Sequence, residues 1–385
     1  MELVKHLQNI KPSFLRNILD SGSIENMISL AGGLPCESCF PLSILEQCFA
    51  KVMIKPSLFQ YGSTEGYQPL IDYLHDVYEL PDTHQALICT GSQQAIDLTI
   101  RAFIEPGDQI LLEAPSYVGT LQAFSLARAD ILTVDQTPTG VDLEQLEDLM
   151  ANNQIKMFYA IPDFNNPTGL CWCLETRKAA AALCQKYDVL FVEDVPYRDL
   201  RFSGETLPLV SEFCPERSII TRSFSKVSTP GIRLGIVYGL KEWMKALIHI
   251  KQAADLHTST PMQSVLLNLI THEGFKDHLA NCRDLYRSRY TTFTKAIKEK
   301  LPSEFTFNQV DGGMFLWLNM PGIDVNAFAE KALEHGVSVI PSTAFYPSCQ
   351  TETPPPAIRL NYTYANEENL VEAVNRMAKV LELMK

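Results

Sequence analysis

Long apolar runs and an excess of basic residues are both absent from this sequence of 385 residues. No run is long enough to cross a bilayer, and the first residues, Met1-Glu-Leu-Val-Lys-His, are too polar for a signal peptide. Lys and Arg number 32 against 45 Asp and Glu, which gives a net charge of −13. Nucleic acids and anionic membrane surfaces both attract basic proteins, so neither is an expected partner. We expect a cytoplasmic location.

Cysteine is too sparse for a disulfide scaffold, with ten residues in the whole chain. Two close pairs, Cys36 with Cys39 and Cys171 with Cys173, have a spacing that occurs in metal and redox sites. No second pair of cysteines or pair of histidines at ligand spacing accompanies them. We therefore expect reduced thiols and no metal site.

The middle of the chain alternates between two patterns. Seven short runs rich in aliphatic and β-branched residues predict strands at 86–90, 109–113, 130–134, 156–161, 189–193, 218–221 and 235–239. Helical segments separate most of them, at 93–103, 117–127, 143–151 and 174–187. This alternation predicts an α/β fold with a mostly parallel seven-stranded sheet and helices on both faces. The last two strands are too close for a crossover helix, so they should be antiparallel.

The ends of the chain have a different character. Residues 241–300 indicate long helices. The stretch 301–385 mixes predicted strands at 314–318, 337–340 and 357–361 with helices at 326–335 and 367–384. A chain of this length exceeds what one hydrophobic core usually holds. We expect an N-terminal arm over residues 1–40 that joins the small domain, a large domain over 41–285, and a small α+β domain over 286–385.

A lysine between two of the predicted strands indicates a specific chemistry. The first strand leads into Ser223, Ser225 and Lys226, and Arg233 precedes the second. An amine can form a Schiff base with an aldehyde, while hydroxyls and a guanidinium can hold a phosphate dianion. Pyridoxal 5′-phosphate (PLP) has both groups. On this stretch alone, a solvated loop lysine is the alternative interpretation.

Polar residues follow other predicted strands, and the carboxyl ends of parallel strands meet at one edge of a sheet. Gly91-Ser92 opens a helix, whose free N–H groups and dipole suit a phosphate. Asn166 precedes Pro167 in a turn, where its amide can donate to a ring oxygen. The structural alternatives are a helix cap for Ser92 and ordinary turn chemistry for Asn166.

Asp194 follows an apolar strand, where an unpaired carboxylate is costly. A protonated ring nitrogen would pair it, and the anion would raise the pKa of that nitrogen. Tyr197 is placed to donate to the phenolic oxygen of the same ring. The alternative interpretation of Asp194 is a helix cap.

Two further residues stand out for their surroundings. Tyr117 follows a predicted strand and can stack on a flat heterocycle, with core packing as the alternative. Arg359 lies within an apolar run, and a buried guanidinium needs an anion such as a carboxylate. An acidic side chain of the protein itself is the alternative partner of Arg359.

In this order, the segments resemble the fold type I PLP-dependent enzymes, specifically the class I and II aminotransferases. The resemblance spans nearly the whole chain. It rests on A-G-G-L-P around Gly33, Y-G-S-T-E-G from Tyr61, G-S-Q-Q-A around Ser92, N-P-T-G from Asn166, D-x-P-Y from Asp194, S-F-S-K ending at Lys226, P-G-I-R-L-G around Arg233, D-G-G-M-F-L-W around Gly313 and I-R-L-N around Arg359. Within the family, the sequence looks most like the 2-aminoadipate/kynurenine aminotransferase branch.

The resemblance implies a role for each of these residues. Lys226 would be the Schiff-base lysine and proton shuttle, and Asp194 would hold the pyridine nitrogen. Asn166 and Tyr197 would contact the ring oxygen, and Tyr117 would stack on the ring. The phosphate would be held by Ser92, Gln93, Ser223, Ser225 and Arg233, and by Tyr61 reaching the neighbouring site of a homodimer. The substrate would be bound by Arg359 through its α-carboxylate, by Gly33, by Asn166 and by Arg16 through an acidic side chain.

The implied function is a PLP-dependent aminotransferase. It would move the amino group of a 2-aminoadipate-, kynurenine- or glutamate-like L-amino acid, or of an aromatic or aliphatic one, to a 2-oxo acid such as 2-oxoglutarate by a ping-pong mechanism. A PLP-dependent β-lyase or decarboxylase is the alternative, because the cofactor-binding residues do not determine which bond breaks. A PLP-binding regulatory domain is a further alternative, although no DNA-binding module fits ahead of residue 30.

Three positions depart from the family pattern. Ser342 stands where glycine is usual, so the substrate loop is expected to differ. Arg222 replaces a common glycine, and Val195 replaces a frequent Asp. We expect the first departure to bear on substrate choice and none to alter the central chemistry.

Overall fold

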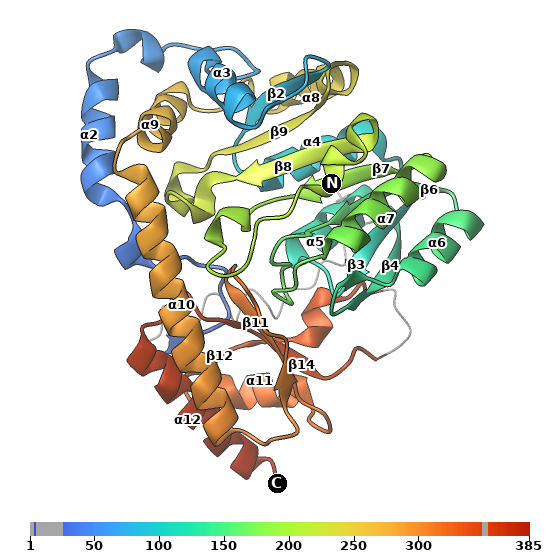
Figure 1. The fold of residues 1–385 in the computed structure, drawn as a ribbon, viewed down its shortest axis with the longest axis vertical. Helices are drawn as coiled ribbons and strands as arrows, with labels where there is room; N and C mark the ends of the chain where they lie inside the picture. The colour runs from blue at the N-terminus through green and yellow to red at the C-terminus, as the bar shows by residue number, and fades with distance from the viewer. Residues whose placement is uncertain (1–3, 5–25, 349–352) are drawn as a thin grey trace.

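The computed structural model describes residue 4, residues 26–348 and residues 353–385. Within these ranges the chain builds an eight-stranded sheet, a four-stranded sheet and a two-stranded sheet. Figure 1 shows the large sheet and its helices above the small one. Helix α10 (Phe275–Lys300) runs along one side from the large layer to the small one.

All seven strands predicted for the large sheet are present. They are β2 (His84–Cys89), β3 (Gln109–Ala114), β4 (Asp130–Thr137), β6 (Ile155–Ala160), β7 (Leu190–Asp194), β8 (Ser218–Ser223) and β9 (Gly235–Leu240), in the order β2-β9-β8-β7-β6-β3-β4. Strand β9 is antiparallel to both of its neighbours, and the others run parallel. The carboxyl ends of the parallel strands therefore share one edge of the sheet.

An eighth strand, β5 (Gly140–Val141), lies at the β4 edge and was not predicted. It has two residues and is antiparallel to β4. Two residues are too few to show the alternation from which a strand is recognised in a sequence.

Helices cover both faces of the large sheet, as predicted. One face carries α4 (Ser92–Phe103), α5 (Val118–Ala127) and α8 (Lys241–Asp255). The opposite face carries two groups of helices. One group is α6 (Leu143–Asn152) and α7 (Leu174–Lys186), and the second is α2 (Leu42–Met53), α3 (Gln68–Val77) and α9 (Thr260–Ile270). Strand β3 shows how the faces divide: Ile110 and Leu112 join the core under α4 and α5, while Leu111 joins the core under α6 and α7.

The smaller sheet is antiparallel. It contains β10 (Thr306–Phe307), β11 (Phe315–Asn319), β14 (Ala357–Asn361) and β13 (Ile340–Pro341), and it packs against α10, α11 (Val325–Glu334) and α12 (Glu367–Leu383). The strand predicted over 337–340 is divided. Its first part, β12 (Val337–Ser338), pairs in parallel with β1 (Ile28–Ser29), while β13 pairs with β14. The chain that follows β1 leads towards the edge of the large sheet.

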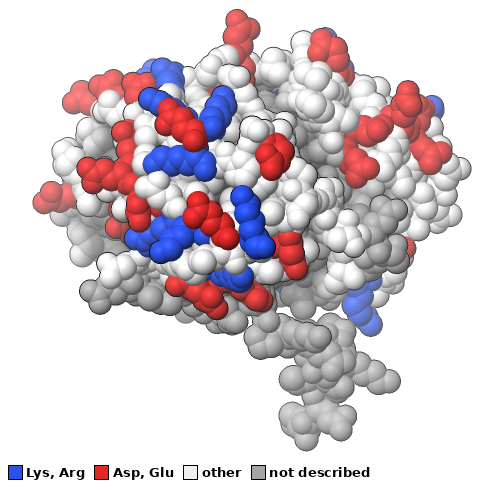
Figure 2. Space-filling model, turned by 90° about the horizontal axis from the view of Figure 1, so that it is seen from below, with Lys and Arg blue, Asp and Glu red and all other residues white. Residues whose placement is uncertain are grey.

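The face seen in Figure 2 has no broad patch of one sign. Lys and Arg side chains stand there among Asp and Glu side chains. This arrangement differs from the clustered basic surface typical of nucleic-acid binding. In the described part of the chain, none of the helices combines the length and the apolarity that a bilayer crossing requires.

Candidate active site

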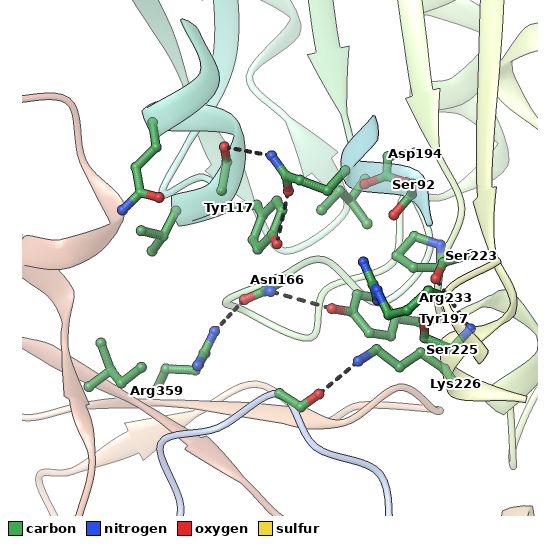
Figure 3. A pocket seen from close by; sticks show the side chains of 18 residues that line it. Ser92, Tyr117, Asn166, Asp194, Tyr197, Ser223, Ser225, Lys226, Arg233 and Arg359 are labelled. Carbon is green, nitrogen blue, oxygen red and sulfur yellow. Dashed lines mark hydrogen bonds between the residues drawn. The ribbon is translucent and has the colours of Figure 1, made fainter. Parts of the chain in front are cut away.

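A pocket of about 380 Å³ opens at the carboxyl edge of the parallel strands (Figure 3). Among the described residues, all of the predicted site residues except Tyr61 line it, namely Gly33, Ser92, Gln93, Tyr117, Asn166, Asp194, Tyr197, Ser223, Ser225, Lys226, Arg233 and Arg359. Its other lining residues are Val118, Gly119, Gln122, Ile161, Pro196 and Ile340. Segments far apart in the sequence thus meet at one site, as the rule for parallel strands predicts.

Two predicted residues, Tyr61 and Arg16, need separate mention. Tyr61 is 80% exposed and lies edge-on to the ring of His257, with 6.0 Å between the ring centroids. Arg16 lies outside the described residues. The roles expected for both remain predictions.

One end of the pocket suits a phosphate. Helix α4 begins at Ser92, and its cap residue Gly91 has φ +79° and offers no side-chain cap. The first residue of β9, Gly235, lies so close that a Cβ there would stand 2.8 Å from Ser92 N. Arg233 packs against Gly91, since a Cβ on Gly91 would stand 2.8 Å from Arg233 Nη2. Free N–H groups, the positive end of a helix and a guanidinium therefore meet at this end.

Lys226 ends the short helix η8 (Phe224–Lys226), which follows directly after β8. Ser223 and Ser225 flank this turn, and Ser223 Oγ accepts a hydrogen bond of 3.3 Å from Ser225 N. The Lys226 ammonium donates to the carbonyl of Gly33 at 2.7 Å. Burial lowers the pKa of Lys226 to about 8, assisted by the positive charges of Arg233 and Arg359. A sizeable neutral fraction near neutral pH makes this amine a competent nucleophile and base.

Asp194 is the last residue of β7, and its buried side chain lines the pocket. Its Oδ2 accepts from the Tyr159 hydroxyl at 2.6 Å, and its Oδ1 accepts from Thr221 Oγ1 at 2.8 Å. Burial raises the pKa of Asp194, while the bonds from Tyr159, Thr221 and the Val195 amide oppose the rise. A cation beside this carboxylate would favour the ionised form further.

Arg359 lies on β14 at the opposite side of the pocket. Its Nη1 donates to Asn166 Oδ1 at 2.8 Å, and its Nη2 donates to the carbonyl of Ala31. The guanidinium lies 4.4 Å from the ring centroid of Phe315 and 5.0 Å from that of Phe345. Burial lowers its pKa to about 10. Its Nε is buried and, within the described ranges, has no hydrogen-bond partner.

Asn166 connects the arginine to the tyrosine that follows β7. Its Nδ2 donates to the Tyr197 hydroxyl at 3.3 Å, so Arg359, Asn166 and Tyr197 form a chain across the pocket (Figure 3). Burial raises the pKa of Tyr197, which keeps its hydroxyl protonated. These residues offer a carboxylate site at one end of the chain and polar groups for a ring oxygen at the other.

Tyr117 precedes helix α5 and is held by two neighbours. Its hydroxyl donates to Gln93 Oε1 at 3.3 Å, and Gln93 Nε2 donates to the carbonyl of Gly119 at 3.2 Å. A Cβ on Gly119 would stand 2.6 Å from the Tyr117 ring, so glycine is needed for this ring position. The Gln93 side chain thus fixes the ring that is expected to stack, and this contact was not anticipated.

The charges of the pocket are complementary to PLP with a bound amino acid. Among the described residues, no ion pair involves Asp194, Lys226, Arg233 or Arg359. The buried anion therefore lacks a cation, which a protonated ring nitrogen supplies. Arg359 is buried, Lys226 is half-buried and Arg233 is exposed, and a phosphate and a carboxylate would supply the anions that these three cations lack. The donor set fits this cofactor on chemical grounds.

Sequence reasoning did not identify Tyr159 or Thr221 as partners of Asp194. Both lie on predicted strands, Tyr159 on β6 and Thr221 on β8, which flank β7. The available signal was the pair of hydroxyl residues near the ends of otherwise apolar strands. It could be read only with the strand order in hand.

The side chains at the three positions that depart from the family pattern pack outside the pocket. Ser342 is buried, and its Oγ accepts from the Ala357 amide at 3.4 Å. Arg222 packs over the ring of Tyr78, 4.0 Å from its centroid. Val195 is buried with apolar neighbours. None of the three lines the pocket.

The chain is similar to known proteins along nearly its whole length. Residues 45–377 match the family model described as aminotransferase class I and II. The aromatic-amino-acid aminotransferase 1 of Thermococcus litoralis is 33% identical over 97% of this chain and 92% of its own. The kynurenine aminotransferase of Pyrococcus horikoshii superposes with a TM-score of 0.93 at 31% identity, over 99% and 97% of the two chains. The alpha-aminoadipate aminotransferase of Thermus thermophilus, solved with N-(5'-phosphopyridoxyl)-L-leucine, gives 0.91 at 33%, over 99% and 97%.

Proposed function

The chain belongs to the class I and II aminotransferases, which use PLP as cofactor, and from this premise we propose the reaction, the substrates and the residues that carry them. The protein transfers the amino group of an L-amino acid to a 2-oxo acid such as 2-oxoglutarate in two alternating half-reactions. Its amino-acid substrates are 2-aminoadipate-, kynurenine- or glutamate-like, or aromatic. The observation that carries the proposal is the set of buried, unpaired charges around Lys226.

The pocket residues would hold PLP at each of its polar groups. Ser92, Gln93, Ser223, Ser225 and Arg233 would hold the phosphate, Asp194 the ring nitrogen, and Asn166 and Tyr197 the ring oxygen. Tyr117 would stack on the ring. When bound, PLP supplies an aldehyde carbon for an amine and an electron sink for the charge left by a lost α-proton.

Lys226 holds and moves the proton. Its Nζ takes the α-proton of the bound amino acid, because a pKa near 8 leaves part of the amine neutral at physiological pH. The carbonyl of Gly33, now 2.7 Å away, gives the lysine ammonium an acceptor. The hydroxyl donors of Asp194 favour its ionised form, which would stabilise positive charge at the ring nitrogen.

Arg359 binds the α-carboxylate of the substrate. Its hydrogen bonds go only to neutral oxygens, those of Asn166 and Ala31. Its buried Nε has no hydrogen-bond partner within the described ranges. The planar fork matches a carboxylate in two-point contact. The rings of Phe315 and Phe345 pack against the guanidinium, with their centroids 4.4 Å and 5.0 Å from it.

The assembly and location form part of the same proposal. The enzyme acts as a cytoplasmic homodimer in which the exposed Tyr61 reaches the phosphate of the neighbouring site. Arg16 recognises an acidic substrate side chain. The chain divides into an arm over residues 1–40, a large domain over 41–285 and a small domain over 286–385.

The test is the visible absorbance of the purified protein before and after addition of L-glutamate. We expect a yellow protein whose band shifts with glutamate and returns with a 2-oxo acid. Lys226→Ala should show no absorbance shift, and its turnover should fall by at least about 10⁴-fold. A yellow protein that ignores every amino acid would contradict the proposal. Release of ammonia and pyruvate from a cysteine conjugate, with no 2-oxo acid added as amino-group acceptor, would identify a β-lyase instead.

A further inference from the structure

A buried carboxylate outside the pocket connects strands β3 and β4 with the loop that follows β6. Glu113 lies near the end of β3 and is 2% exposed. Its Oε2 accepts from the Ile161 amide at 2.9 Å and from Asn165 Nδ2 at 2.8 Å. Its Oε1 accepts from Trp172 Nε1 at 3.0 Å and from Gln136 Nε2 at 3.0 Å. All four donors converge on one side chain.

Three of these donors belong to a single loop. Residues 161–173 connect β6 to α7, and Glu113 holds the loop at its start, at its tip and near its end through Ile161, Asn165 and Trp172. The loop closes on itself, because the Asn165 amide donates to the carbonyl of Leu170 at 2.8 Å. Glu113 therefore fixes the loop as one unit against the sheet.

The loop presents Asn166 to the pocket. This residue is the direct neighbour of Asn165, and its amide contacts Arg359 Nη1 at 2.8 Å and the Tyr197 hydroxyl at 3.3 Å. Arg359 has only one other hydrogen-bond acceptor in the described part of the chain, the carbonyl of Ala31. A shift of the loop thus changes one of the two contacts that orient the guanidinium.

We propose that Glu113 is a positioning residue for substrate binding, which acts through the loop 161–173 and Asn166 on the orientation of Arg359. The proposal rests on the function proposed above, in which Arg359 binds the α-carboxylate. Glu113 itself does not line the pocket.

An ionised carboxylate is the group this position requires. Four N–H donors need acceptor positions on both oxygens, and a carboxylate supplies them. Burial raises the pKa of Glu113 to about 7, and the four donors oppose that rise because each favours the ionised form. In Glu113→Gln, the new NH₂ group would face two of these buried donors whichever way the amide turned. Repulsion between donors would push the loop away.

The chain offers a matched control on the strand β7. Glu193 is also fully buried near a strand end, and it accepts from two backbone amides, Val210 at 3.0 Å and Ser211 at 2.8 Å. These belong to the helix η6 (Val210–Glu212), which does not line the pocket. Glu193→Gln therefore imposes a similar conflict on a segment without a role in the site.

The experiment measures binding of 2-methylglutamate, which has no α-proton to lose, to the PLP-loaded protein at pH 8 from the cofactor absorbance. We expect Glu113→Gln to weaken binding about 10- to 100-fold and to raise KM more than it lowers kcat. Glu193→Gln should lower Tm by a similar amount and change binding less than about 2-fold. Equal binding losses in the two variants, or none in Glu113→Gln, would overturn the proposal.

A double variant tests the contacts themselves. Gln136 Oε1 is buried without a partner among the described residues, so a turned Gln136 amide would accept from the NH₂ group that Glu113→Gln introduces. Adding Trp172→Phe removes the other donor on that side. We expect the double variant Glu113→Gln/Trp172→Phe to bind at least about 5-fold more tightly than Glu113→Gln alone. No recovery would count against the proposal.

Two further arms keep the result decisive. If Glu113→Gln does not fold, Trp172→Phe alone should weaken binding about 3-fold, and unchanged binding would overturn the proposal. If the wild-type protein transfers no amino group, the proposed aminotransferase function is wrong, and the positioning role of Glu113 is tested by structure instead. A crystal structure of Glu113→Gln then decides: the contact between Asn166 and Arg359 should be lost, and its retention would refute the positioning role.

Discussion

Two regions of the molecule differ in whether their buried charges have counterions within the chain. Behind the pocket, Asp163 pairs with Arg177 at 2.7 Å and with Arg198 at 2.7 Å. Burial alone would raise the pKa of Asp163, but the two guanidiniums outweigh it and lower the pKa. In the pocket, Arg359 and Lys226 are bound only to neutral oxygens. Burial lowers the pKa of both.

The difference separates structural charges from functional ones. A buried charge that the chain itself neutralises stabilises one arrangement of the loops around it. A buried charge that the chain leaves without a counterion costs stability until a ligand supplies one. The buried Asp194 and Arg359 and the half-buried Lys226 are of the second kind. The exposed Arg233 also has no ion-pair partner in the described part of the chain, so the pocket is built for a ligand with charges of both signs.

The largest effect on stability is expected from the structural pair. Asp163→Ala leaves the Arg177 guanidinium buried without an anion, because that side chain is 0% exposed. The free energy of unfolding should fall by about 3–5 kcal/mol, measured by urea denaturation. Asp97, whose pair with Arg101 is exposed, is the control, and Asp97→Ala should cost less than about 1 kcal/mol. Equal losses in the two variants would remove the basis of the comparison.

The functional arginine should behave in the opposite way. In Arg359→Met, an unpaired charge is replaced by an apolar side chain of similar length, so the substrate-free protein should unfold at equal or greater free energy. Its kcat/KM should nevertheless fall about 10²- to 10³-fold, because the α-carboxylate loses its partner. Steady-state kinetics and urea denaturation of the same preparation measure both. A loss of stability as large as that of Asp163→Ala would show that Arg359 is a structural charge.

The sequence predicted the meeting of the site residues because one rule governs it. Polar residues followed the strands ending at Ala160, Asp194 and Ser223, and parallel strands place such ends side by side. The apolar runs were long enough to fix these strands. The small sheet was harder, because 337–340 divides between two partner strands, and only the pairing with Ile28 and Arg359 shows where.

The supporting contacts could not be predicted in this way. Glu113 ends a strand like many polar residues, and its donors are spread from Ile161 and Trp172 back to Gln136. The contact between Lys226 and Gly33 joins residues 193 positions apart. Such contacts depend on how loops pack over the sheet edge, which no local period or spacing specifies. They come from the tertiary fold alone.

The pH dependence of stability gives a smaller test of the unpaired lysine. The folded pKa of Lys226, about 8, lies below the ordinary value of 10.5, so between these values the unfolded chain binds more protons. Stability of the PLP-free protein should therefore rise with pH from 8 to 10.5, by up to about 3 kcal/mol at 1.36 kcal/mol per unit. Lys226→Met lacks this rise, and the difference between the two proteins isolates it from other titrating groups. Parallel pH curves would contradict the assignment.

The smallest effect is expected from removing one of the two hydroxyl groups that donate to Asp194. Tyr159→Phe removes the 2.6 Å hydrogen bond to Asp194 Oδ2 and leaves the one from Thr221. The loss of about 1 kcal/mol should appear as weaker PLP binding and a kcat lowered about 5- to 10-fold. Tyr187→Phe removes a comparable hydroxyl bond to the exposed Glu147 and should change neither quantity. If Tyr159→Phe binds PLP as the wild type does, the backbone and Thr221 alone hold Asp194. The hydroxyl of Tyr159 would then contribute nothing to the function of this carboxylate.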